Sequence, residues 1–159
     1  MLTSLQVGST VVTLAPELTS PQMISRLVEE GVIVCGGHSG ATYAQTRDAL
    51  AQGLSGFTHL YNAMTPLQSR EPGMVGAALA DDDSWFGIIA DGHHIHPAAF
   101  SVAVAAKKRG GALLVTDAMP TVGSPDTSFI LDGKTIVASD GRVTNAEGTL
   151  AGSDLNMLL

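Results

Sequence analysis

Short apolar runs recur through the first 115 residues, and each one ends at a polar residue or a turn. They cover residues 11–15, 32–35, 57–60, 85–90 and 112–115. Continuous apolar runs of this kind are typical of strands that are buried on both faces of a parallel sheet. The pattern therefore predicts five parallel strands, each followed by a loop that begins with polar side chains.

The segments between these runs have the signals of helices. Ser20-Pro21 offers an N-cap followed by a proline at the first helical position, and Thr42 with Gln45 forms a capping box. Two further helices are expected over 74–79 and 97–109. Strands that alternate with helices along the chain predict the α/β class.

The pattern changes after residue 117. Apolar and polar residues over 129–143 indicate a small β-hairpin around Asp132-Gly133, and Asp140-Gly141 offers a second turn. We treat the hairpin as an excursion from a single domain that covers 1–159.

Polar residues with possible chemical roles stand at or near the ends of three consecutive runs, the third of which, Phe-Thr-His-Leu at 57–60, contains one itself. Glu17, His38 and His59 follow one another at 21-residue intervals. Strand ends converge at one mouth of a β/α barrel, so His38 and His59 can hold one metal ion there. The alternative is that each histidine bonds only a loop carbonyl, but the matched spacing favours a metal.

Other polar residues after the fourth and fifth runs allow two interpretations each. Asp117 fits a general base, or the N-cap of a following helix. Asp91 fits a second carboxylate at the mouth or, the interpretation we favour, a cap for the turn after it. Of His93, His94 and His96, no more than two can face the mouth.

Composition and charge narrow the possible partners and the compartment. A chain of 159 residues with 45% hydrophobic and 14% charged residues can bury a core as one domain. The net charge of −7 argues against nucleic acid and against an anionic membrane surface. A single cysteine, Cys35, fits inert core in a reducing cytoplasm, and neither a membrane span nor a signal peptide is expected. Arg70 fits an anion-binding residue or a solvated surface side chain.

Six short motifs together resemble the N-acetylglucosamine-6-phosphate deacetylases of the amidohydrolase superfamily. They are Thr-Leu-Ala-Pro-Glu at 13–17, Gly-His-Ser at 37–39, Thr-His-Leu-Tyr-Asn-Ala-Met at 58–64, Arg-Glu-Pro-Gly at 70–73, Ile-Ala-Asp-Gly at 89–92 and Val-Thr-Asp-Ala at 115–118. The resemblance implies a (β/α)₈ TIM-type barrel, of which this chain would supply about five of the eight strands. It also implies removal of the acetyl group from N-acetylglucosamine 6-phosphate.

The resemblance assigns roles to individual residues. It makes His38 and His59 ligands of one divalent metal ion, for which zinc, iron or cobalt is suitable, with zinc preferred. It makes Asp117 the acid–base that takes a proton from the attacking water and returns it to the leaving amine. The positions that match substrate contacts are Asn62, Ala63, Arg70, His94, Leu150, Ala151 and Gly152. In the family Arg70 reaches the substrate phosphate of the neighbouring subunit, so a homodimer is expected.

One departure from the family leaves alternatives open. The His-Leu-Glu-Gly-Pro motif that carries the metal's glutamate does not occur in these 159 residues. Glu17 has a suggestive spacing, but it matches a different position of the family. The alternative to an enzyme is therefore a non-catalytic half-barrel that lacks the metal-binding glutamate. A different reaction of the superfamily, hydrolysis of a cyclic amide, is disfavoured by Arg70 and by Asn62-Ala63.

Overall fold

Two sheets organise the chain, one with parallel strand pairs and one antiparallel. The computed structural model describes residues 8–109 and 111–156. The first of two compact units consists of the chain up to Ile88 together with Ser101–Leu113, and the second of Ile89–Phe100 and the chain from Leu114 onward. That both belong to one partial barrel domain over 1–159 stays a prediction.

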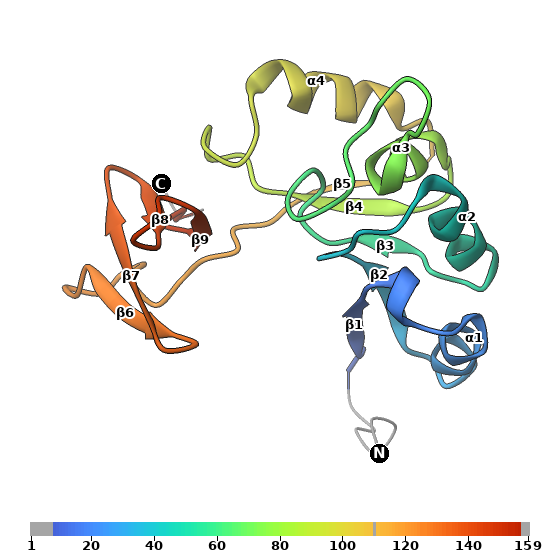
Figure 1. Ribbon diagram of the computed structural model, residues 1–159, viewed down its shortest axis with the longest axis horizontal. Helices are drawn as coiled ribbons and strands as arrows, with labels where there is room; N and C mark the ends of the chain where they lie inside the picture. Colours follow the sequence, from blue (N-terminus) through green and yellow to red (C-terminus); the bar gives the residue numbers. More distant parts are fainter. Residues whose placement is uncertain (1–7, 110, 157–159) are drawn as a thin grey trace. The chain divides into compact units, whose positions relative to one another are not determined.

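The first sheet has five strands whose order in space is their order in the chain (Figure 1). They are β1 (Val11–Leu14), β2 (Ile33–Gly36), β3 (Gly56–Phe57), β4 (Trp85–Ile88) and β5 (Ala112–Leu114). The first three neighbouring pairs are parallel. The α/β class and the number of five strands are confirmed, but the third strand is shorter than the predicted 57–60 and ends at Phe57, before Thr58 and His59. Closure into an eight-stranded barrel remains an expectation from the resemblance.

Helices connect the strands as the sequence predicted. They are η2 (Pro16–Leu18), α1 (Pro21–Glu29), α2 (Tyr43–Ala51), α3 (Gly73–Ala80) and α4 (Pro97–Ala106). The Ser20 hydroxyl accepts a hydrogen bond from the Met23 N–H at 3.2 Å, and Thr42 with Gln45 forms the complete capping box. None of the helices within the described ranges is long and apolar enough to cross a membrane.

The register of the sheet decides which loop residues lie opposite one another. Cys35 pairs with Gly56, an offset of 21 residues, so His38 and His59 stand equally far beyond their paired strands. In contrast, Thr13 pairs with Cys35, an offset of 22 residues. The 21-residue interval between Glu17 and His38 thus differs by one residue from the offset of β1 and β2, and Glu17 itself lies beyond the end of β1, in η2.

The core of the first unit lies around β2, β3 and β4. Their inward side chains include Val34, Phe57 and Phe86, all of which are inaccessible to solvent. Every residue of α3 from Gly73 to Leu79 is buried as well. At the end of α3, the Lys107 ammonium donates to the carbonyl oxygens of Ala78 and Asp81, both at 2.7 Å. A lysine at a helix C-terminus satisfies carbonyls that have no partner within the helix.

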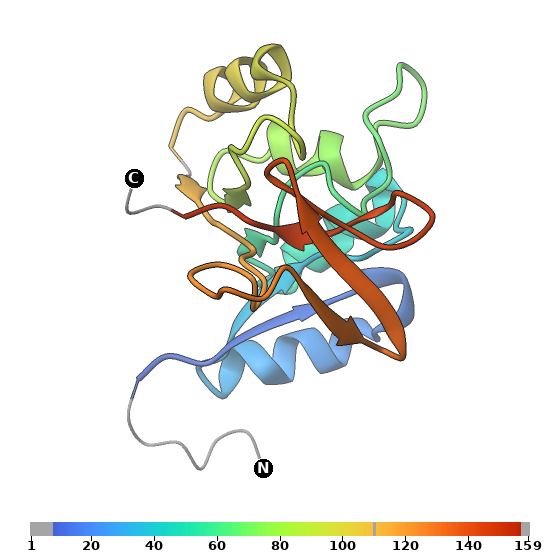
Figure 2. The same ribbon diagram turned by 90° about the vertical axis from the view of Figure 1, so that its left-hand side faces the viewer.

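The second unit contains an antiparallel sheet of four strands in the order of the chain. They are β6 (Ser128–Leu131), β7 (Lys134–Ser139), β8 (Arg142–Thr144) and β9 (Leu150–Ser153), and Figure 2 shows them in orange to red. The turns at Asp132-Gly133 and Asp140-Gly141 have positive φ at both positions, as two-residue hairpin turns of type I′ require. Both predicted turns are confirmed. The predicted excursion over 129–143 was too small, because β9 adds a fourth strand beyond it.

Replacement of Gly56 by alanine is expected to destabilise the first unit. A Cβ at this position would lie 2.4 Å from two atoms of the Trp85 ring, which belongs to the paired residue of the next strand. Overpacking of this kind costs about 1–3 kcal/mol of the free energy of unfolding. Urea unfolding of dilute protein measures this cost.

The matched control is Gly111→Ala, where a Cβ would meet nothing within 4 Å. Its effect should stay below about 0.5 kcal/mol. In a Trp85→Leu background the cost of Gly56→Ala should shrink, because the colliding ring is gone. Equal costs in both backgrounds would refute the steric explanation.

Candidate metal centre

His38 and His59 meet beyond the ends of β2 and β3. Their Nε2 atoms are 2.8 Å apart, and the two rings meet edge to face with centroids 4.7 Å apart. At this separation the two nitrogens can share one proton. They could also share one metal ion after moving apart slightly, because two nitrogens bound tetrahedrally to zinc at about 2.0–2.1 Å lie about 3.3–3.4 Å from each other. The predicted convergence of the two side chains is observed, and their role as metal ligands stays a prediction.

Both histidines have a left-handed backbone conformation. The φ angle is 48° at His38 and 34° at His59, and the predicted acid–base Asp117 has 51°. Such angles are uncommon for residues other than glycine and cost of order 1–3 kcal/mol, so they persist only where the surroundings impose them. The same conformation at all three positions is a feature that apolar periodicity cannot reveal.

Hydrogen bonds of Ser39 tie the two histidine loops together. The Ser39 N–H donates to the carbonyl oxygen of Ala63 at 2.9 Å, and a parallel bridge joins Ser39 to Met64. The Ser39 side chain is buried and its hydroxyl accepts from the Ala41 N–H at 3.0 Å. The loop that carries His38 is therefore joined to the loop that carries His59.

Glu17 holds the loop after His38 from the side of β1. Its Oε2 accepts from the Ser39 hydroxyl at 2.6 Å and its Oε1 from the Gly40 N–H at 2.5 Å. Burial raises the pKa of Glu17, but the hydrogen bonds outweigh that effect and hold the pKa below its usual value. Within the described ranges, no group of three His, Cys, Asp or Glu side chains is placed to hold a metal ion.

The predicted substrate-contacting residues of the first unit lie in the loop after β3. The Asn62 amide donates to the carbonyl oxygens of His59 and Leu60, both at 3.3 Å. Ala63 has a φ of 48°, and Arg70 is exposed farther along the loop. Sequence reasoning did not single out Glu71, whose Oε1 accepts from the Tyr43 N–H at 2.6 Å and the Gly73 N–H at 3.1 Å. The residue beside Arg70 thus anchors this loop to α2.

Asp91 and His94 form a buried pair in the second unit. Asp91 Oδ1 accepts from the backbone N–H groups of His93 and His94, at 2.9 and 2.8 Å, which confirms the predicted turn cap. Its Oδ2 lies 2.6 Å from Nδ1 of His94, and both side chains are only 5% exposed. A carboxylate on Nδ1 fixes the orientation of an imidazole ring and directs Nε2 to the opposite side.

The neighbouring histidines have structural partners. His93 Nδ1 accepts from the Arg142 guanidinium at 3.2 Å, and His96 Nδ1 accepts from the Ala98 N–H at 3.1 Å at the start of α4. Which of the three face the mouth stays a prediction.

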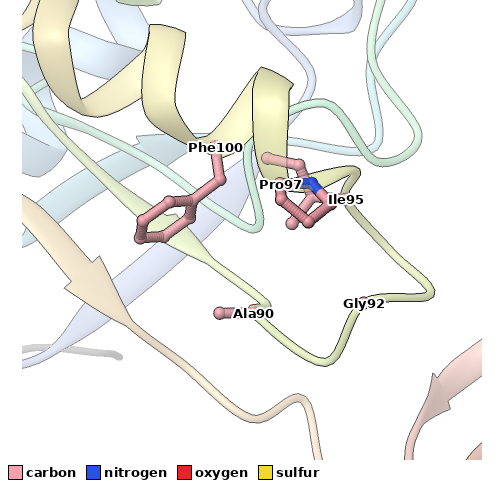
Figure 3. Close-up of a pocket in the computed structure, with 5 residues that line it drawn as sticks. All are labelled: Ala90, Gly92, Ile95, Pro97 and Phe100. Carbon is pink, nitrogen blue, oxygen red and sulfur yellow. The ribbon is translucent and has the colours of Figure 1, made fainter.

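A small apolar pocket lies between this loop and the start of α4. It has a volume of about 240 Å³ and is lined by Ala90, Gly92, Ile95, Pro97 and Phe100 (Figure 3). Ile95, the residue after His94 in the chain, is buried. The apolar side chains and the Asp91 hydrogen bonds together fix the loop on which His94 stands.

Asp117 lies beside the strand that carries the last predicted substrate contacts. The Ser153 N–H donates to the Asp117 carbonyl oxygen at 2.8 Å, and the Met119 N–H donates to the Ser153 carbonyl oxygen at 3.0 Å. A Cβ on Gly152, whose φ is 88°, would lie 2.9 Å from that same Asp117 oxygen and 2.3 Å from the Met119 side chain. Leu150, Ala151 and Gly152 belong to β9, although the resemblance implied that these substrate-contact positions lie in a loop. No helix follows Asp117 in residues 118–127, so the N-cap alternative is wrong. The position of Asp117 relative to the histidine pair stays a prediction.

Comparison with known proteins identifies the class to which this arrangement corresponds. No family model matches the chain. The chain is 48% identical over 151 residues to an N-acetylgalactosamine-6-phosphate deacetylase of Shewanella sp.. The aligned region covers 94% of this chain and 38% of that protein. The chain is 41% identical over 148 residues to the N-acetylglucosamine-6-phosphate deacetylase of Bacillus subtilis, with coverages of 92% and 37%.

A solved structure agrees with these sequence matches. The N-acetylglucosamine-6-phosphate deacetylase of Pasteurella multocida superimposes with a TM-score of 0.88 at 39% identity, over 94% of this chain and 39% of that one. The chain is therefore a homologue of amino-sugar-phosphate deacetylases. More particularly, it corresponds to a segment of N-acetylglucosamine- and N-acetylgalactosamine-6-phosphate deacetylases that makes up about two fifths of their length. The resemblance seen in the sequence motifs is thereby confirmed.

The Asp91–His94 pair predicts a component of acid sensitivity. Burial raises the pKa of Asp91, but hydrogen bonds from His94 and from the His93 N–H outweigh it and lower the pKa below its usual value. The ionised carboxylate thus stabilises the fold fully at pH values above about 3.9, the pKa of Asp in the unfolded chain. This stabilisation is lost as the pH falls from there through the lower pKa that Asp91 has in the folded protein. Asp91→Asn should therefore unfold more easily than wild type at pH 7, with a difference that shrinks in acid.

Urea midpoints between pH 7 and pH 2 measure this difference. Glu147→Gln, at an exposed position of the same unit, is the control and should follow the wild-type curve. A difference for Asp91→Asn that stays constant down to pH 2 would contradict the assignment.

Proposed function

We propose that the protein carrying this chain is a metal-dependent hydrolase that removes the acetyl group from an N-acetylated amino-sugar 6-phosphate. The observation that carries the proposal is the 2.8 Å approach of His38 Nε2 to His59 Nε2. The names of the homologues support the deacetylase class. Because the chain spans only 38% of the first of these relatives, the activity of the complete protein is part of the proposal.

The histidine pair fits one divalent metal ion. Two neutral imidazole nitrogens are donors that zinc, iron and cobalt all accept, with zinc our first choice. We propose that the third protein ligand comes from outside the described residues, since these contain no third His, Cys, Asp or Glu at the pair. A bound ion would polarise the amide carbonyl of the substrate and lower the pKa of the attacking water.

The remaining roles belong to side chains of this chain. Asp117 would accept a proton from the attacking water and then donate it to the amine nitrogen as the C–N bond breaks. His94, oriented by Asp91 at 2.6 Å, would hold the substrate near the reacting carbonyl through Nε2. Asn62, Ala63 and residues 150–152 would line the sugar site, and Arg70 would bind the phosphate of the neighbouring subunit's substrate in a homodimer.

The comparisons leave two epimeric sugars as candidate substrates. The chain is 48% identical to the Shewanella N-acetylgalactosamine-6-phosphate enzyme and 41% identical to the Bacillus N-acetylglucosamine-6-phosphate enzyme. N-acetylglucosamine 6-phosphate is the substrate implied by the sequence motifs, and the identities favour N-acetylgalactosamine 6-phosphate as the second candidate. The two sugars differ only in the configuration of one hydroxyl, so both belong in the assay.

A full-length hybrid tests the proposed reaction. In this hybrid, residues 1–159 replace the matching segment of the Shewanella deacetylase. We expect bound zinc and release of acetate from at least one of the two sugar phosphates. Asp117→Asn should retain the metal and lower kcat by at least about 10²-fold, because general acid–base help is usually of that size. His59→Asn should lose the metal.

Metal analysis, circular dichroism and an acetate assay, run beside the parent enzyme, separate the outcomes. A folded, zinc-loaded hybrid that hydrolyses neither sugar phosphate would refute the proposed reaction. Near-normal turnover of Asp117→Asn would remove Asp117 from the mechanism.

The 159-residue chain by itself should release little or no acetate, even with added zinc. Two protein ligands bind a metal less tightly than the three of a complete catalytic site. The comparison is the same acetate assay, with chain and hybrid at equal concentration. Comparable turnover would show that the chain supplies its own third ligand. No turnover by a folded hybrid would favour the non-catalytic half-barrel.

A further inference from the structure

We infer that Glu17 is a positioning residue for the candidate metal centre, which holds the His38 loop so that the two Nε2 atoms converge. The inference rests on the proposed metal site, and it concerns a side chain that the site itself does not include. Glu17 reaches the loop from η2, the short 3₁₀ helix that follows β1, and β1 is the neighbour of β2 in the sheet. It therefore links three consecutive strand ends.

The contacts of Glu17 fall on the residues that immediately follow His38. Oε2 accepts from the Ser39 hydroxyl at 2.6 Å, and Oε1 accepts from the Gly40 N–H at 2.5 Å. Hydrogen bonds to an ionised carboxylate are shorter and stronger than those between neutral groups. The backbone on the C-terminal side of His38 is thus held by two such bonds.

The N-terminal side of His38 is held by packing. A Cβ on Gly37 would lie 3.0 Å from side-chain carbons of both Thr13 and Thr58, so the backbone there fits closely between the neighbouring strands. The hydroxyls of these two threonines are 2.7 Å apart. His38, at a φ of 48°, is therefore restrained on both sides. Without Glu17, this side would keep the Ser39 hydrogen bonds to Ala63 and Ala41 but lose both bonds to the carboxylate, and the loop could shift toward an ordinary conformation.

The effect of Glu17 extends to the second histidine. Ser39, which donates through its hydroxyl to Glu17, donates through its backbone N–H to the Ala63 carbonyl oxygen at 2.9 Å. Ala63 belongs to the loop that begins with His59. The chain of contacts Glu17–Ser39–Ala63 consequently sets the position of one histidine loop relative to the other, which is the geometry that a shared ligand requires.

The hydrogen bonds of Glu17 favour a positioning role over direct coordination of the metal. Both carboxylate oxygens of Glu17 are engaged by donors of the residues after His38, namely the Ser39 hydroxyl and the Gly40 N–H. No set of three potential ligands within the described residues includes it. Partners that orient metal ligands typically contribute 10–100-fold to metal affinity, and we expect an effect of this size.

Metal affinity of the full-length hybrid is the test. Glu17→Gln keeps the shape of the side chain but replaces one acceptor oxygen with an NH₂ group, and Ser39→Ala removes the donor. Each should weaken Co²⁺ binding about 10-fold or more in competition with a chelator. The double variant should be little worse than Glu17→Gln, because both remove the same contact. The visible spectrum of the Co²⁺ that does bind should match wild type, since the ligands are unchanged.

Asp81→Asn is the matched control. Asp81 is also a carboxylate whose hydrogen bonds lower its pKa despite burial, and it accepts from the Ser84 N–H at 2.8 Å and from Arg47 at 2.9 Å. It precedes β4 in the chain and so lies at the opposite end of the sheet from the histidines. Asp81→Asn should lower stability but leave the Co²⁺ affinity unchanged.

The outcomes distinguish this inference from the proposed function. Wild-type affinity in Glu17→Gln would overturn the positioning role while the metal site stands. An altered Co²⁺ spectrum in Glu17→Gln, together with normal affinity in Ser39→Ala, would overturn it in favour of direct coordination. A folded wild-type hybrid that binds no metal would overturn the proposed function itself, and the inference with it.

Discussion

The parallel pairing of β1, β2 and β3 is the constraint on which the candidate site depends. Parallel strands send their carboxyl ends to the same edge, so three successive loops must emerge together. The offset of 21 residues between β2 and β3 then places His38 and His59 at equivalent positions. A shift of that register by one residue would also turn the strand side chains to the opposite face. The buried Val34, Phe57 and Phe86 therefore protect the geometry of the histidine pair.

Features that depend on local chemistry could be predicted from the sequence. Ser20 and the Thr42–Gln45 capping box start helices because their side chains satisfy N–H groups within the next turn. The Asp-Gly turns form because both residues tolerate a positive φ. Buried Cys35 behaved as expected for core, since burial raises the pKa of its thiol to about 11.

Features that depend on distant partners could not be predicted in the same way. The 21-residue spacing made Glu17 a tempting metal ligand, which the family pattern disfavoured. The hydrogen bond that Glu17 accepts from Ser39 depends on how two distant loops meet, and no sequence pattern reveals it. β9 was missed because Leu150-Ala-Gly-Ser153 lacks the β-branched residues typical of strands, and its pairing with β8 is irregular. The left-handed backbone at His38, His59 and Asp117 leaves no periodic signal, because it arises from the loops that surround each residue.

The charge of the chain adds a condition that the proposed substrate must meet. A net charge of −7 repels a phosphate ester in general, but this long-range effect is screened over about 8 Å at physiological salt. Recognition would therefore depend on a local cation, and Arg70 offers a guanidinium on an exposed loop. Its neighbour Glu71 would oppose binding if its carboxylate faced the phosphate. Instead, Oε1 of Glu71 accepts from the backbone N–H groups of Tyr43 and Gly73. The acidic side chain that could have weakened the proposed anion site thus anchors the Arg70 loop instead.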